Sequence, residues 1–263
     1  MSLFGPKRPL SKDEWEWQLA SFKWLLAEFG GIERNPTNVL VLPTAEYFPP
    51  TSGEPAEKAQ QIFDQVRTLS GMAEWPTRLL AGEASKEANI ASGISLVHEN
   101  HAPAGEFLVK NGPTGEQLAE IRYNPRHLAN PESLIATFAH ELSHYLMANA
   151  KSDPPGGWDI HELTTDLTAV YLGFGIFMAN SAWNFEGHSS FDQQGWQYER
   201  QGYLTERGLV TAIAIWETLA GRDPMAAAPF LKPHLAKDLK KATAYVHKNA
   251  VAQEIAEYDL EQY

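Results

Sequence analysis

The chain has 263 residues, 43% of them hydrophobic and 21% charged, which is ordinary for a soluble globular protein and ample for a buried core. Its 33 acidic and 21 basic residues give a net charge of -12, which disfavours nucleic acid and acidic membrane surfaces as partners. There is no cysteine, so disulfides, thiolate metal sites and cysteine nucleophiles are excluded, and a transition metal must be held by His, Asp or Glu.

The first half of the chain predicts helices and short strands. A helix is expected over 11–29, because Ser11 and Glu14 form a capping-box pattern and Gly30 with Gly31 ends the apolar pattern. A second helix is expected at 54–69, with short strands at 39–42, 90–97, 107–109 and 116–123 and a turn at 111–115.

From residue 130 the pattern becomes helical. Asn130 can cap a helix with Pro131 at its first position, and this helix is expected to run to about Ala150, before the DPPGG stop at 153–157. After it we expect a helix at 159–180, a polar and aromatic segment at 181–203, and helices near 206–220, 224–231 and 233–247. We therefore predict an α+β fold in one unit over 1–263, with an α/β half at 1–125 and a mainly helical half at 126–263.

The first of these later helices carries the stretch FAHELSHYLM at 138–147. His140 and His144 are four residues apart, so both imidazoles project from one face and can bind one Zn²⁺. Glu141 lies about 100° around the helix from His140, where it can reach a water bound to that ion and take its proton. The alternative interpretation is that the two histidines are ordinary core residues.

A third ligand is expected in the stretch HELTTD at 161–166. Glu162 and Asp166 are four residues apart, so both can face the first helix. Glu162 would bind the metal, and Asp166 would accept the spare N–H of a ligand histidine and fix its tautomer. Three alternatives stay open: His161 as the ligand, Asp159 or Asp166 as the ligand, and Asp159 with Glu162 as a simple helix-capping pair.

Together, the two stretches resemble the gluzincin metallopeptidases, the thermolysin-like class, in which HExxH is followed by ExxxD on a second helix. Here 17 residues separate His144 from Glu162, and the resemblance covers about residues 130–180. It implies a zincin-like fold, one catalytic Zn²⁺ and a peptide or protein substrate. The metzincin pattern fails, because Met147 and Ala150 stand where it requires Gly and His.

The gluzincin resemblance also implies a role for the strand before the metal helix. In zincins, a strand in the position of 120–123 lines the cleft and pairs with an extended peptide. The alternative is that 120–123 belongs to an ordinary edge strand.

Weaker patterns indicate further candidate catalytic and metal-binding residues. Metallopeptidases use a Tyr, His or Arg to stabilise the oxyanion, and the segment after the second helix offers Tyr203, His188, Tyr198 and Arg200. We take Tyr203 and His188 as the catalytic candidates, although no spacing rule selects between them and all four can simply cover the core. His98 and His101 are a second possible metal site, or solvent-facing loop residues.

These patterns predict a zinc-dependent hydrolase, in particular a peptidase. His140, His144 and Glu162 would hold Zn²⁺, Glu141 would activate water and protonate the leaving amine, and Asp166 would orient a ligand histidine. The competing hypotheses are a zinc-binding protein-interaction module without turnover and a metal-free helical interaction protein. The first residues lack the apolar region of a signal peptide, and no apolar run reaches roughly 20 residues, so we expect a cytoplasmic protein that does not bind membranes.

Overall fold

The computed structural model describes residues 5–31, 39–82, 87–90, 94–97, 105–111, 117–186 and 203–257. Its helices are α1 (Lys12–Phe29), α2 (Pro55–Leu69), α3 (Pro131–Met147), α4 (His161–Tyr171), α5 (Gly175–Glu186), α6 (Glu206–Leu219), α7 (Pro233–Lys248) and α8 (Val251–Ala256), with short 3-10 helices η2 (Pro125–Ala129), η3 (Trp158–Ile160) and η5 (Pro224–Phe230). The strands are β1 (Thr77–Ala81), β2 (Glu87–Ile90), β3 (Ile94–Val97), β4 (Gly105–Asn111) and β5 (Gln117–Tyr123). Within the described residues the fold is mixed α and β and mainly helical, and none of these helices combines the length and apolar character that a membrane crossing requires.

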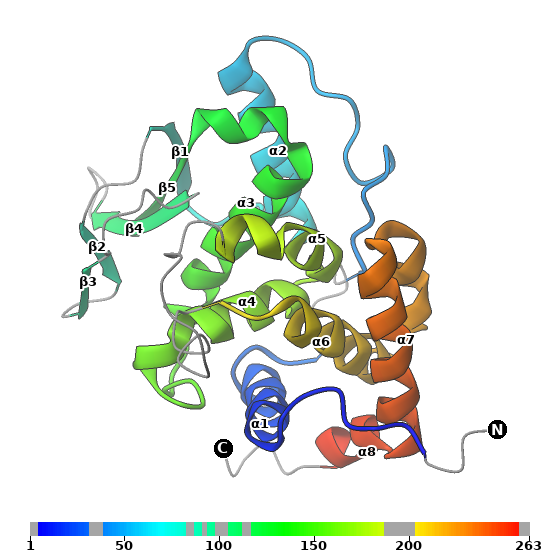
Figure 1. Cartoon of the computed structure of the whole chain (residues 1–263). Coiled ribbons are helices and arrows are strands. Elements are labelled where there is room, and N and C mark those ends of the chain that lie inside the picture. Colours follow the sequence, from blue (N-terminus) through cyan, green and yellow to red (C-terminus); the bar gives the residue numbers. More distant parts are fainter. Residues whose placement is uncertain are drawn as a thin grey trace.

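A three-stranded mixed sheet lies at one side of the molecule, beside α2 and α3 (Figure 1). The strand order is β1-β5-β4, with β1 parallel to β5 and β4 antiparallel to it. The expected strand at 90–97 is not one strand: 94–97 forms β3, which pairs antiparallel with β2 in a second, two-stranded sheet, and 91–93 lie outside the described residues. Strand β1 was not expected from the sequence, since its residues, TRLLA, do not alternate strictly between apolar and polar.

The position of β5 corrects one prediction about peptide binding. Leu79 of β1 and Phe107 of β4 both pair with Ile121, so the backbone of β5 is hydrogen-bonded on both sides. It is therefore the central strand, and the two readings of 120–123, a peptide-pairing strand and an edge strand, are both wrong. A central strand has no unpaired row of N–H and C=O groups to offer to a peptide.

The two faces of β5 differ as the alternating pattern predicts. Ile121 and Tyr123 are buried toward the helices, and the Tyr123 ring lies 5.8 Å from the Phe138 ring of α3. On the opposite face Glu120 and Arg122 form an ion pair at 2.6 Å. Glu120 is nevertheless only 4% exposed, so this face is also covered at that position.

Helix α3 is the centre of the fold. Asn130 caps it, as predicted, by accepting a hydrogen bond from the Ser133 N–H, and Pro131 opens its first turn. Every residue from Ser133 to Met147 is buried, because α2, α4, α5, β4 and β5 all contact this helix. The helix ends at Met147, three residues before the predicted end, and its polar residues are thus held in a tightly packed interior.

Helix α1 and the loop between α3 and α4 are joined by hydrogen bonds. The predicted capping box at Ser11 is confirmed at the start of α1. Near the end of this helix, Glu28 accepts from the N–H of Ser152 at 3.0 Å, and Trp24 Nε1 donates to the Ser152 hydroxyl at 3.0 Å. Trp17 Nε1 donates to the carbonyl of Pro155 at 2.9 Å. These contacts restrain the loop that leads from α3 into α4.

The predicted helix at 159–180 is in fact two helices, α4 and α5, which meet at Gly173. This glycine has a φ of +99°, a conformation that residues with a Cβ rarely adopt. Its carbonyl accepts a hydrogen bond from the N–H of Val41 at 3.0 Å. The predicted strand at 39–42 is wrong, because this segment joins no sheet and instead crosses the junction between the two helices.

We expect Gly173→Ala to destabilise the protein by roughly 3 kcal/mol or more, from backbone strain together with steric overlap. The added Cβ would collide with the backbone carbonyl oxygen of Val39, which cannot move without displacing the buried Val41. Gly221→Ala is the matched control, since Gly221 also has a positive φ, of +67°, but a Cβ there meets nothing. Urea unfolding should give a loss of about 1 kcal/mol for the control, and equal losses in the two variants would contradict the role of the crossing segment.

Candidate metal centre

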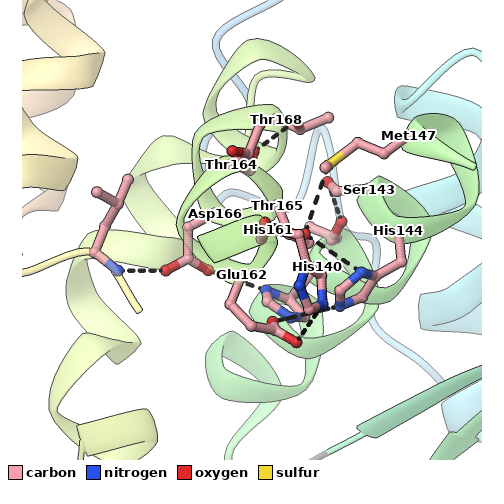
Figure 2. A network of polar contacts seen from close by, with 12 residues as sticks. His140, Ser143, His144, Met147, His161, Glu162, Thr164, Thr165, Asp166 and Thr168 are labelled. Carbon is pink, nitrogen blue, oxygen red and sulfur yellow. Dashed lines mark hydrogen bonds and ion pairs between the residues drawn. The ribbon is translucent and has the colours of Figure 1, made fainter. Parts of the chain in front are cut away.

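Helices α3 and α4 bring together three side chains that can bind a metal ion (Figure 2). His140 and His144 lie one turn apart on α3, and Glu162 lies in the first turn of α4. The Nε2 atoms of the histidines are 3.1 Å apart. Oε2 of Glu162 lies 3.0 Å from Nε2 of His140 and 3.5 Å from Nε2 of His144. The two predicted histidines and the predicted third ligand therefore meet at one point.

Hydrogen bonds at the other nitrogens orient both imidazoles. Nδ1 of His140 lies 3.0 Å from Oδ1 of Asp166, and because a carboxylate only accepts, the proton belongs on Nδ1. Nδ1 of His144 lies 3.3 Å from the hydroxyl of Thr165, which itself donates to the carbonyl of His161 at 2.9 Å. The hydroxyl therefore accepts from His144. In neutral histidines this arrangement leaves both Nε2 atoms unprotonated beside the carboxylate of Glu162.

The arrangement fits a divalent metal ion. Three acceptor atoms this close repel one another unless a positive charge, a proton or a metal ion, lies between them. Oε2 of Glu162 is buried and has no well-oriented hydrogen bond. Tetrahedral coordination at about 2.0–2.1 Å gives ligand-to-ligand distances of about 3.3–3.4 Å, close to those observed here. Two imidazole nitrogens and one carboxylate oxygen also leave a fourth position for water or substrate.

The electrostatics of the cluster favour a cation. Burial alone would lower the pKa of His140, but its contacts with Asp166 and Glu162 raise that pKa well above the usual value. Burial would raise the pKa of Glu162, but the neighbouring histidines hold it well below the usual value. The pKa of His144 is lowered, chiefly by burial. The cluster thus keeps Glu162 ionised and stabilises positive charge beside it.

Tyr203 is the one oxyanion candidate that the described residues place at this site. Its ring centroid lies 5.7 Å from that of His140. Burial, followed by the negative charges of Glu162, Asp166 and Glu141, raises the pKa of Tyr203 well above its usual value, so the phenol keeps its proton. Glu141 is itself buried on α3. The other candidates lie outside the described residues, namely His188, Tyr198, Arg200 and the second possible metal pair, His98 and His101.

The alternatives to Glu162 as third ligand are not favoured by the structure. His161 lies outside the three-residue cluster, with Nδ1 2.6 Å from the carbonyl of Trp158 and Nε2 3.1 Å from the other oxygen of Glu162, Oε1. Asp159 is exposed in η3. Helix α4 begins without a side-chain cap, so Asp159 and Glu162 are not a capping pair. Asp166 contacts Nδ1 of His140, whereas it is Nε2 of this histidine that meets His144 and Glu162.

Two contacts at the site were not foreseen from the sequence. Thr165 orients His144, and the backbone N–H of Leu204 donates to Oδ2 of Asp166 at 2.8 Å. The position of Thr165, three residues after Glu162 on the same helical face, was a usable signal. The contact with Leu204 has no side-chain signature, because a main-chain group makes it.

Comparison of the chain with protein-family models, with curated proteins and with solved structures finds no match. The gluzincin resemblance therefore remains one of motif residues, carried by 140–144 and 162–166.

We expect Glu162→Gln to weaken zinc binding more than His161→Ala. Glutamine keeps the shape of the side chain but removes the charge and leaves only a weakly basic amide oxygen. His161 contacts the oxygen of Glu162 that faces away from the two histidines, so its loss should cost no more than the roughly 10- to 100-fold typical of a residue that orients a ligand. Competition with a chromogenic chelator measures both affinities. A stronger loss in His161→Ala would show that the third ligand is misassigned.

Proposed function

We propose that the chain is a zinc-dependent hydrolase that cleaves peptide bonds, with a zincin-like fold and a gluzincin-type site. The observation that supports this most strongly is the convergence of His140 Nε2, His144 Nε2 and Glu162 Oε2 on one point. A second carboxylate, that of Glu141, follows directly on the first ligand. A site that only stores or binds a metal does not need this extra acid, whereas hydrolysis needs a proton acceptor.

When bound, the ion supplies Lewis acidity, which polarises a substrate carbonyl and lowers the pKa of an attacking water. Glu141 is the general base that takes the proton from this water, and then returns it to the nitrogen of the leaving amine. Asp166 holds the proton on Nδ1 of His140, which keeps Nε2 available as a ligand. Thr165 does the same for His144.

Tyr203 is the residue that would donate a hydrogen bond to the carbonyl oxygen of the substrate. Its high pKa keeps the O–H protonated, so the phenol can donate a hydrogen bond to the negative charge that develops on the carbonyl oxygen. A phenolate at this position would instead be repelled by Glu141, Glu162 and Asp166. The raised pKa is therefore consistent with a donor in the transition state.

The experiment that tests this proposal compares zinc-loaded wild-type chain with zinc-loaded Glu141→Gln on a mixed peptide library. Cleavage by wild type alone, lost when zinc is removed with a chelator, supports the hydrolase. Equal cleavage by both proteins would exclude Glu141 as the general base.

A further inference from the structure

Asp166 contacts two parts of the chain that are distant in sequence. Its Oδ1 lies 3.0 Å from Nδ1 of His140, and its Oδ2 accepts from the N–H of Leu204 at 2.8 Å. The side chain is 3% exposed, so water does not compete effectively for either oxygen. Figure 2 shows Asp166 directed from α4 toward His140, with its second oxygen turned away toward the backbone of another segment. Both oxygens of one buried carboxylate are thus engaged.

The Leu204 contact is one residue along the chain from Tyr203. Leu204 is 8% exposed, and its side chain belongs to the hydrophobic core just before α6. Thr205 caps α6 by accepting from the Gly208 N–H at 3.0 Å. Tyr203 precedes these anchored residues and its ring lies 5.7 Å from that of His140. A change at the Leu204 N–H therefore moves the main chain that positions the phenol.

We propose that Asp166 is a positioning residue that couples the imidazole of His140 to the chain position of Tyr203. A carboxylate is rigid and planar. A hydrogen bond from the His140 ring to Oδ1 therefore restricts the direction in which Oδ2 can accept a hydrogen bond. Fixing His140 steadies the Leu204 N–H, and releasing His140 loosens it. The catalytic consequence rests on the proposed function: when His140 is held in the orientation that binds zinc, the phenol of Tyr203 is held where it can reach the substrate oxygen. Coupling of this kind is reciprocal, so holding the 203–204 segment also favours zinc binding.

Hydrogen exchange of the Leu204 amide in the full-length chain, labelled with ¹⁵N-leucine, tests the coupling directly. Without metal, His140→Ala should speed this exchange roughly 10-fold, as expected when a charge-assisted hydrogen bond loses its support. His144→Ala is the matched control, because it removes a neighbouring ring that contacts Nε2 of His140 but leaves the contact between His140 Nδ1 and Asp166 in place. Adding zinc to the wild type should slow the exchange. The amide of Leu209, which donates to Thr205 within α6 at 2.9 Å, should be unchanged throughout.

A pair of variants at Leu204 gives an independent measurement. Leu204→Pro removes the N–H that Asp166 accepts, whereas Leu204→Ala removes the core side chain and keeps the N–H. Zinc affinity should fall roughly 10-fold further in the proline variant than in the alanine variant. Equal affinities, or equal Leu204 exchange in His140→Ala and His144→Ala, would overturn the coupling. A wild type that binds no zinc would refute the proposed function, and the two histidine variants would still decide the coupling without metal.

Discussion

His140→Ala is expected to weaken zinc binding by on the order of 10²- to 10³-fold, the share of one ligand in a typical structural zinc site. The variant removes one of the three side chains that converge on the site, and it also leaves Oδ1 of the buried Asp166 without its imidazole partner. His144→Ala should weaken binding through the loss of a ligand alone, since His144 contacts Thr165 rather than a carboxylate at its other nitrogen. The measurement is the zinc content of purified protein, with affinity from competition with a chelator.

The control for these two variants is His234→Ala. His234 lies on α7, its side chain is 57% exposed, and it pairs with Glu206 rather than with any residue of the cluster. Its loss should leave one zinc per chain. A folded wild-type chain that stays metal-free after dialysis against micromolar zinc would refute the site altogether.

The features that could be predicted from the sequence are those determined by neighbouring residues. Ser11 and Asn130 cap their helices through side chains that reach three residues along the chain. His140 and His144 share a face because helical geometry alone determines it. The alternation in β5 likewise predicts a strand with Ile121 facing the helices. None of these requires knowledge of a distant partner.

The features that the sequence could not reveal depend on such partners. The path of 39–42 depends on Gly173, more than a hundred residues later, whose carbonyl accepts from the Val41 N–H. The central place of β5 depends on β1 joining it in parallel, and nothing within β5 indicates how many neighbours a strand has. The break at Gly173 had a local signal that the periodicity outweighed: the N–H groups of Gly173 and Phe174 donate back to Val170 and Ala169, a helix end that favours glycine.

In the candidate site, too, the features set by local spacing could be predicted and those set by distant contacts could not. Spacing alone could place Glu162 and Asp166 on one face of α4, but not decide which atom each would meet. Tyr203 could not be chosen among the aromatic and basic residues near it, because no spacing rule links it to His140. The nearby contact at Leu204 is made by a main-chain N–H, a group present in nearly every residue. The structure describes Tyr203 beside His140, whereas His188, Tyr198 and Arg200 lie outside the described residues.

Glu141→Gln is expected to keep the zinc and lose the turnover. Glu141 is not among the three side chains that converge at the candidate metal site, so metal content should stay near one per chain. Glutamine fills nearly the same buried space but cannot accept the proton of the water or return one to the leaving amine. Loss of a positioned general base typically costs about 10²- to 10⁴-fold in rate. The comparison is kcat for a peptide that the wild type cleaves, with zinc content measured on the same samples.

Glu132→Gln is the matched control, because it makes the same chemical change on the exposed first turn of α3, away from the buried cluster. It should cleave as the wild type does. Burial is the main cause of the raised pKa of Tyr203 and Glu141 is a lesser one, so in Glu141→Gln this pKa should fall slightly and stay above its ordinary value. Ultraviolet difference spectra of each protein against its own Tyr203→Phe variant can follow this pKa. A Glu141→Gln protein that holds zinc and still cleaves at the wild-type rate would remove Glu141 from the chemistry. A wild type that binds zinc and cleaves nothing in a broad library, with Tyr203 unaffected by the substitution, would instead favour a zinc-bearing interaction module.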